Sequence, residues 1–215
     1  MKSFLLQGLV VLLLSGATFA VPVTALTVSG GILSSNTFTW GYLFSLSQNV
    51  TITSLGVFDD AGDGMAQAQN VAIWDSGGTM VLQGVVAAGS SDPLIDGFRF
   101  TSALTGSTSF AAGTYTIGTQ RIGSGSVNAV FRGVVSTVSG VNFLGTVNNG
   151  SSTVFSQPTF SNPNTMIGPS FQIDDPTPAP ELSPGGLPIT LVMLTCMVLM
   201  GQRRQASFHL GQPRE

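Results

Sequence analysis

The sequence predicts an all-β fold: a single antiparallel β-sandwich domain, jelly-roll-like, flanked by an N-terminal signal peptide and a C-terminal transmembrane helix. Two observations predict the sandwich. Aromatic side chains at positions 38, 40, 42 and 44 alternate with mostly small or polar neighbours, which is the period of a β-strand. Further β-rich runs follow at short intervals, separated by clusters of Gly, Asn, Asp, Ser and Pro, and this punctuation is typical of sandwiches and jelly rolls.

The N-terminal residues have the pattern of a secretion signal. Lys2 precedes an uncharged, mainly apolar run from Phe4 to Leu14, which is too short to span a bilayer. Small residues then offer two cleavage sites, after Ala20 or after Ala25, and the sequence leaves both open. We therefore assign residues 1–25 to a signal peptide, with a retained N-terminal anchor as the alternative.

The β domain is assigned to residues 26–175, and no stretch of it has a helical period with caps. After the aromatic strand, the pattern predicts further strands at Val50 to Phe58, Val71 to Trp74, Thr79 to Val86, Phe98 to Leu104, Thr114 to Gly118, Ala129 to Val135, Val138 to Leu144 and Ser170 to Ile173.

Charge limits the partners that this domain can have. Charged residues make up 8% of the chain, against about 25% in typical soluble proteins. Residues 26–184 hold three arginines and nine acidic residues, so the basic footprint that nucleic acid requires is missing. Solubility rests on Ser, Thr, Asn and Gly, which suits an extracellular setting.

The residue types of the domain exclude several chemistries. The chain's lysine, cysteine and histidine are Lys2, Cys196 and His209, all outside residues 26–175. Catalytic Ser-His-Asp and Cys-His systems, Schiff-base lysine and His/Cys metal sites are therefore excluded. Carboxylates remain, and the motif Asp75-Ser76-Gly77 of aspartic proteases reads better as a hairpin turn. We predict a protein that is not an enzyme, with a carboxylate-only hydrolase as the remote alternative.

Two groups of residues are candidates for binding. Asp59, Asp60 and Asp63 could offer oxygens to a weak calcium site, although an ordinary acidic turn explains them as well and no other cofactor is expected. Trp40, Tyr42 and Trp74 could stack on sugar rings if exposed, although strand alternation favours core positions for Trp40 and Phe44.

The C-terminal residues predict a membrane segment. A Pro/Gly-rich linker spans residues 176–186, an uncharged apolar run spans 187–202, and Arg203-Arg204 open a basic tail that spans 203–215. At about 1.5 Å per residue the run is shorter than a hydrocarbon core of ~30 Å, but it can insert at modest cost by thinning the bilayer. The arginines would stay in the cytoplasm. A buried core helix is the alternative.

The order of these C-terminal parts resembles a known sorting signal. Pro180-Glu181, the apolar run and then Arg203-Arg204 are similar to the PEP-CTERM tag of Gram-negative bacteria. The resemblance implies recognition by an exosortase, a membrane transpeptidase-like enzyme that cuts near the Pro-Glu motif. Cleavage of the tag and simple anchoring both stay open.

A second resemblance covers about residues 36–120 and concerns the fold alone. Spaced hydrophobic and glycine positions are similar to those of bacterial extracellular β-sandwich domains of unassigned function, which often precede PEP-CTERM tags. The positions that carry it are Trp40 to Phe44, Ile52 to Asp59, Val71 to Asp75, Gly78, Phe98 to Phe100 and Ala111 to Tyr115.

These observations predict an exported, non-enzymatic protein of the cell surface or extracellular matrix. Its expected partners are the membrane, through the C-terminal helix, and an exosortase-like processing enzyme. The alternative is a carbohydrate-binding module that recognises exopolysaccharide.

Overall fold

The structure is a computed structural model that describes residues 21–34, 38–121, 129–150 and 154–174. All of these residues belong to one compact unit, Met1–Thr177, while a second unit, Pro178–Glu215, lies outside them. The predicted membrane segment and the motif residues Pro180, Glu181, Arg203 and Arg204 are therefore outside the described residues. Within the described ranges, no helix is long and apolar enough to cross a membrane.

The described residues form an all-β, antiparallel fold, which confirms the predicted fold class at this level. Their only helical element is a 3-10 turn, η1, at Asp60–Gly62. The strands are β1 (Pro22–Thr24), β2 (Leu26–Ser29), β3 (Ile32–Ser34), β4 (Trp40–Leu46), β5 (Val50–Phe58), β6 (Gln69–Trp74), β7 (Met80–Val86), β8 (Leu94–Ile95), β9 (Phe98–Thr101), β10 (Leu104–Gly106), β11 (Ser109–Phe110), β12 (Gly113–Arg121), β13 (Ala129–Phe131), β14 (Val134–Thr137), β15 (Val141–Asn148), β16 (Phe160–Asn162), β17 (Met166–Ile167) and β18 (Pro169–Asp174).

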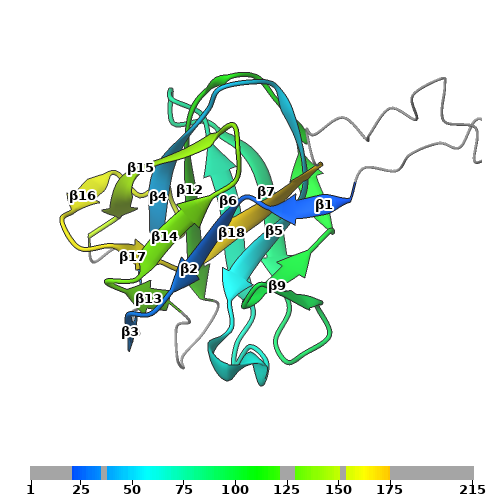
Figure 1. The fold of residues 1–215 in the computed structure, drawn as a ribbon, viewed down its shortest axis with the longest axis vertical. Helices are drawn as coiled ribbons and strands as arrows, with labels where there is room; N and C mark the ends of the chain where they lie inside the picture. The colour runs from blue at the N-terminus through cyan, green and yellow to red at the C-terminus, as the bar shows by residue number, and fades with distance from the viewer. Residues whose placement is uncertain (1–20, 35–37, 122–128, 151–153, 175–215) are drawn as a thin grey trace, which may run out of the picture. The chain divides into compact units, whose positions relative to one another are not determined.

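Two larger sheets make up most of the domain (Figure 1). The first has the order β1-β18-β5-β9-β8, with β11 also paired to β5. The second has the order β10-β7-β6-β12-β4-β15-β16. Two small sheets, β17-β13-β3 and β14-β2, accompany them. Because β18 pairs with both β1 and β5, the last strand of the domain lies beside its first (Figure 1).

One hydrophobic core joins the two larger sheets. Tyr42, Phe44 and Leu46 alternate along β4 and are all buried, as the period-two pattern predicts. Phe44 meets Phe171 of β18, with ring centroids 4.8 Å apart. Burial of these aromatic side chains is the main source of stability for such a domain.

A second, smaller cluster lies at the start of β4. Trp40 packs there with Ala129 and Met166, and the Phe38 ring stacks on Trp40 with centroids 4.6 Å apart. Residues on one face of β4 therefore belong to both clusters. The aromatic stripe in the sequence is long because it covers the main core and the second cluster.

Several predicted strand boundaries differ from the structure. The predicted strand from Ala129 to Val135 is divided into β13 and β14 by Arg132, whose φ of 59° is left-handed and incompatible with a strand. The predicted strand from Val138 begins only at β15, because the amide of Val141 donates to the carbonyl of Val138 in a turn.

The sequence leaves signal cleavage open between Ala20 and Ala25, and the structure describes the residues from Val21 onward. Strand β1 and the buried residue Ala25 fall inside residues 1–25, which the sequence assigns to the signal peptide. In the structure they belong to the folded domain.

Candidate functional site

The three aromatic residues predicted as sugar contacts are buried. Trp40, Tyr42 and Trp74 expose 4%, 0% and 3% of their surface. Trp74 lies against Phe155, with centroids 5.5 Å apart, and Tyr42 lies in the main core. Stacking on a sugar requires an exposed ring face, so this assignment is corrected: the three residues are core anchors.

Burial has a chemical consequence for Tyr42. Desolvation raises the pKa of its phenol well above the ordinary value of 10.0, and the side chain of Ser170 offsets only part of that rise. The Ser170 hydroxyl donates its own proton to the carbonyl of Leu26, at 2.7 Å. The phenol of Tyr42 is therefore a neutral part of the core.

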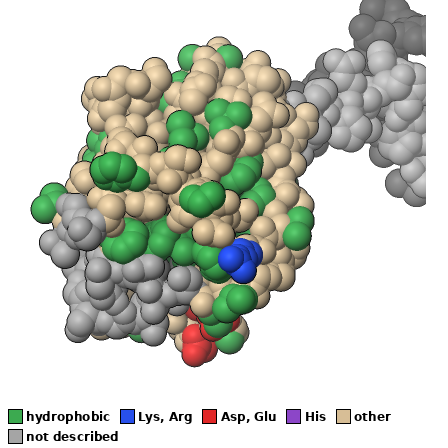
Figure 2. Space-filling model, turned by 90° about the vertical axis from the view of Figure 1, so that its left-hand side faces the viewer, with side chains coloured by type: hydrophobic (Ala, Val, Ile, Leu, Met, Phe, Trp, Pro, Cys, Tyr) green, Lys and Arg blue, Asp and Glu red, His purple; other side chains and the backbone are tan. Residues whose placement is uncertain are grey.

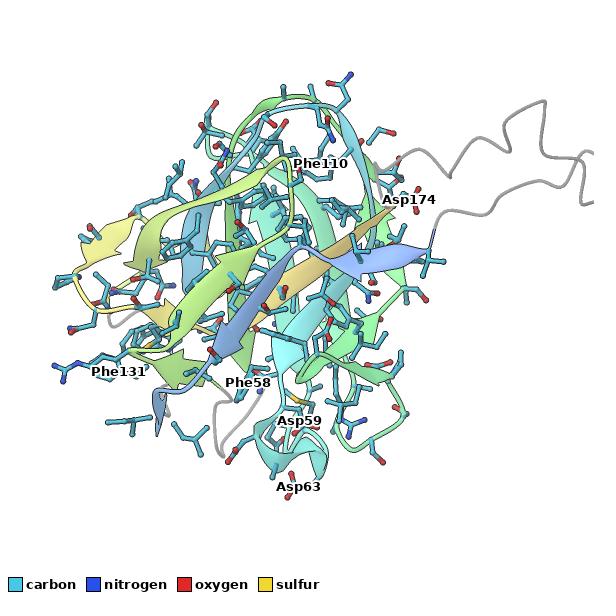
Figure 3. The ribbon with its side chains drawn as sticks, in the orientation of Figure 1. Phe58, Asp59, Asp63, Phe110, Phe131 and Asp174 are labelled. Carbon is cyan, nitrogen blue, oxygen red and sulfur yellow. The ribbon has the colours of Figure 1, made fainter. Side chains whose placement is uncertain are left out.

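The three carboxylates of the acidic loop after β5 differ in their burial. Asp59 is buried at the base of the loop, whereas Asp60 and Asp63 are exposed, with Asp63 at the tip (Figure 3). Asp60 and Asp63 line a hollow of about 430 Å³ together with Gly89. Among the described residues, no group of three or more His, Cys, Asp or Glu side chains is arranged to hold a metal ion. The three carboxylates predicted for calcium are thus not brought together.

Arg99 of β9 neutralises Asp59 instead. Its Nε lies 2.6 Å from Oδ2 of Asp59, and both side chains are almost completely buried. The same carboxylate oxygen accepts the amide of Gly64, which closes the acidic loop. The other oxygen, Oδ1, is buried without a hydrogen-bond partner, so Arg99 supplies most of the compensation for this charge.

The guanidinium of Arg99 also holds the loop that precedes β8. Nη1 donates to the carbonyls of Ser90 and Asp92, and Nη2 donates to the carbonyl of Gly62. One side chain therefore ties two loops to the sheet. The planar fork of arginine suits this task, because its donors point in fixed directions.

Asp75, the first residue of the protease-like motif, is engaged in its own turn. Its Oδ1 accepts the amides of Gly77 and Thr79, at 2.9 and 2.8 Å. The amide of Asp75 donates to the carbonyl of Thr79, which closes a hairpin between β6 and β7. The arrangement agrees with the turn interpretation.

A polar hollow lies at the first sheet, lined by residues of β1, β5, β9 and β18. Ser54 and Gln172 face each other across β5 and β18, and the Ser54 hydroxyl donates to Oε1 of Gln172 at 2.5 Å. Their neighbours Leu55 and Phe171 belong to the core, so alternation directs Ser54 and Gln172 to the opposite face. The hollow has a volume of about 390 Å³ and is lined by Pro22, Thr53, Ser54, Asp92, Pro93, Phe100, Thr101, Ser102, Ala103 and Gln172. We call it the Ser54–Gln172 hollow.

The lining of this hollow suits an uncharged, polyhydroxylated ligand. Its lining has hydroxyl, amide and carboxylate groups and the apolar residue Phe100, with one negative charge at Asp92 and no cationic side chain. Such groups can exchange hydrogen bonds with hydroxyls, whereas an anion would meet repulsion. Asp92 is fixed in place, because its carboxylate accepts the amide of Ala87 at 2.7 Å and its carbonyl accepts Arg99.

Most of the visible surface is neither charged nor strongly apolar. In Figure 2, basic and acidic atoms occupy small areas among polar side chains, backbone and scattered hydrophobic groups. This agrees with the low charged fraction of the chain.

Sequence reasoning missed Arg99 and the hollow. The signal for Arg99 was a single arginine between Phe98 and Phe100, because a charge within an apolar strand must be paired when it is buried. The hollow had no such signal, since Ser54 and Gln172 are 118 positions apart and are polar residues of ordinary strands.

No protein-family model matches this chain, and no curated protein matches it.

Proposed function

We propose that this chain is an exported, non-enzymatic protein of the bacterial cell surface or extracellular matrix. Its β domain, interpreted as a jelly-roll-like sandwich, is displayed by a C-terminal segment similar to a PEP-CTERM tag. An exosortase-like enzyme and the membrane are the proposed partners of that segment.

The proposal rests on the position of the folded residues in the sequence. Among the described residues, strands begin at Pro22, after the apolar N-terminal run, and end at Asp174, before the Pro/Gly-rich linker. A self-contained domain thus occupies the stretch between the two predicted targeting segments. This is the arrangement that an exported and anchored domain requires.

The geometry of the carboxylates supports a non-enzymatic role. Asp59 is paired with Arg99, Asp75 is bonded to its own turn, and Asp92 accepts a backbone amide. A carboxylate hydrolase needs two acids held at a fixed separation in one cleft, and these three are used by the loops that carry them. Asp60 and Asp63 line one hollow, but both are exposed residues of the acidic loop.

Antibody labelling of intact cells tests the display. A producing Gram-negative host should expose the β domain to an antibody added outside, or release it into the medium. Labelling that requires permeabilised cells, with the full chain in the cytoplasm, would contradict the proposal.

A carbohydrate-binding role is the second candidate, now at the Ser54–Gln172 hollow instead of at the aromatic residues. The observation in its favour is the set of hydroxyl, amide and carboxylate groups that line one recess without a cationic side chain. Because Arg99 holds Asp92 and the neighbouring loop, the wall of the hollow is fixed before any ligand arrives, which lowers the cost of binding.

A steric variant tests the hollow. The exposed residue Ala103 lines it, so Ala103→Arg should fill the space and weaken binding to neutral glycans on an array at least tenfold. Thr105→Arg, on exposed β10 outside the hollow, is the matched control and should bind like the parent. If the parent binds no neutral glycan, or Ala103→Arg binds equally well, this second candidate is wrong.

A further inference from the structure

We propose that the signal peptide is removed by hydrolysis of the bond between Ala20 and Val21, and that residues 21–25 stay in the mature protein as part of its fold. This inference rests on the proposed export. It decides between two cleavage sites that the sequence alone treats as equal.

The first argument is the pairing of β1. Pro22, Val23 and Thr24 lie opposite Asp174, Ile173 and Gln172 of β18, in antiparallel register. Pro22 stands at the start of an edge strand, where a residue without an amide proton is tolerated. A cut after Ala25 would remove this strand and leave the edge of β18 unpaired.

The second argument is the burial of the residues around the alternative bond. Ala25 and Leu26 are both completely buried and belong to the main core. The amide of Ala25 donates to the carbonyl of Phe171 at 2.8 Å, and its carbonyl accepts the amide of Val138 at 3.1 Å. Residue 25 therefore links the first sheet to the segment that follows β14.

The third argument concerns the new amino terminus. Hydrolysis adds one water across the peptide bond: the hydroxyl goes to the carbonyl carbon of the outgoing residue, and the proton goes to the nitrogen that becomes the α-amino group. After Ala25 that charged group would be on Leu26, which has no exposed surface. After Ala20 it would be on Val21, which is 72% exposed. A charge buried without a partner is strongly disfavoured, so the fold with residues 21–25 in place favours the terminus at Val21.

Retention of residues 21–25 also completes the Ser54–Gln172 hollow. Pro22 is part of its lining, and Thr24 pairs directly with Gln172. A mature chain that began at Leu26 would lack that wall.

The test is the N-terminus of the exported protein. The full chain is produced in a Gram-negative host, and the exported form is analysed by intact mass and N-terminal sequencing. We expect it to begin at Val21. A mature form that begins at Leu26 would overturn this inference and leave the proposed export intact, whereas a chain that keeps Met1 would overturn both.

Substitutions on the full chain give a matched comparison. Signal peptidase reads a small residue just before the cut, so Ala20→Leu should leave a precursor that still begins at Met1. Ala17→Leu, three residues earlier, should mature normally. Equal maturation of the two variants would show that the bond after Ala20 is not the one cut.

A deletion tests whether residues 21–25 stabilise the mature fold. If residues 21–25 are removed, so that the signal joins Leu26 directly, the exported protein should melt at least about 5 °C lower than the parent or fail to accumulate. An unchanged melting temperature would show that these residues do not contribute to the mature fold.

Discussion

At the scale of single residues, the domain depends on the buried cation Arg99. Arg99 offsets the charge of Asp59 and holds carbonyls from two loops, at Gly62 and at Ser90 and Asp92. Lysine could not replace it, because an ammonium group lacks the planar fork that reaches these acceptors.

We predict that Arg99→Met strongly destabilises the domain. Removal of one partner leaves Asp59 as a buried, unpaired charge, a change that typically costs about 3–5 kcal/mol. Urea unfolding measures the difference. Arg132→Met is the control: Arg132 is exposed, and its contact with the Phe131 ring should be worth less than about 1 kcal/mol. Equal urea midpoints for the two variants would contradict the role assigned to Arg99.

A second prediction at this scale concerns Tyr42 and the pH dependence of the domain's stability. Burial raises the pKa of Tyr42 in the folded state, so its contribution to stability is complete below the unfolded pKa of about 10. As the pH rises above about 10, the unfolded tyrosine ionises while the folded one stays protonated, and stability falls by up to about 1.4 kcal/mol per pH unit.

The Tyr42 effect can be isolated because the chain has only two tyrosines. Melting temperatures between pH 8 and pH 11 should fall for the parent, fall much less for Tyr42→Phe, and fall as in the parent for Tyr115→Phe, which changes the half-buried tyrosine. If Tyr42→Phe keeps the full alkaline loss, the phenol is not the group responsible.

At the scale of elements, tight turns set the register of the strands. Asp96 and Gly97 join β8 to β9 with φ values of 51° and 82°, so both central residues of this two-residue hairpin are left-handed. The carbonyl of Gly97 accepts the amide of Asp59, which connects the hairpin to the acidic loop.

We predict that Gly97→Ala costs about 1 kcal/mol, because an L side chain disfavours this conformation. The added methyl group would lie 3.5 Å from the Phe58 ring, an ordinary contact, so the cost comes from the backbone. Gly77→Ala, at a glycine whose φ is not positive, is the control and should change stability little. Thermal unfolding compares them, and an equal effect at both positions would reject the backbone explanation.

Strand prediction succeeded where the pattern was long. β5 was predicted with its observed ends, and the aromatic stripe of β4 gave its buried face correctly. Short strands such as β3, β11 and β17 were missed, because two or three residues carry no measurable period and are defined by their partners. The division at Arg132 was missed because a left-handed arginine has no sequence signature.

At the scale of the whole molecule, the sequence could predict the fold class but not the candidate site. Alternation along β4 favoured core positions for Trp40 and Phe44, and both residues are buried. The Ser54–Gln172 hollow depends on β5, β9 and β18 meeting in one sheet, and a single sequence does not contain that long-range pairing.

The central claim is that the β domain is exported and sorted through its C-terminal segment. Two variants separate sorting from anchoring. Glu181→Ala should block conversion to a smaller species and leave the chain in the membrane, because insertion depends on the apolar run and on Arg203-Arg204. Leu194→Arg should release the domain uncut, because a charge in mid-segment costs about 2.5–3.5 kcal/mol.

The most direct measurement is therefore fractionation of the full chain and these two variants in a host that has an exosortase, with detection by an antibody against the β domain. We expect a shortened parent at the surface or in the medium, a full-length membrane form of Glu181→Ala, and a soluble, uncut form of Leu194→Arg. Processing of Glu181→Ala like the parent would contradict the sorting role, and membrane retention of Leu194→Arg would contradict the anchor itself.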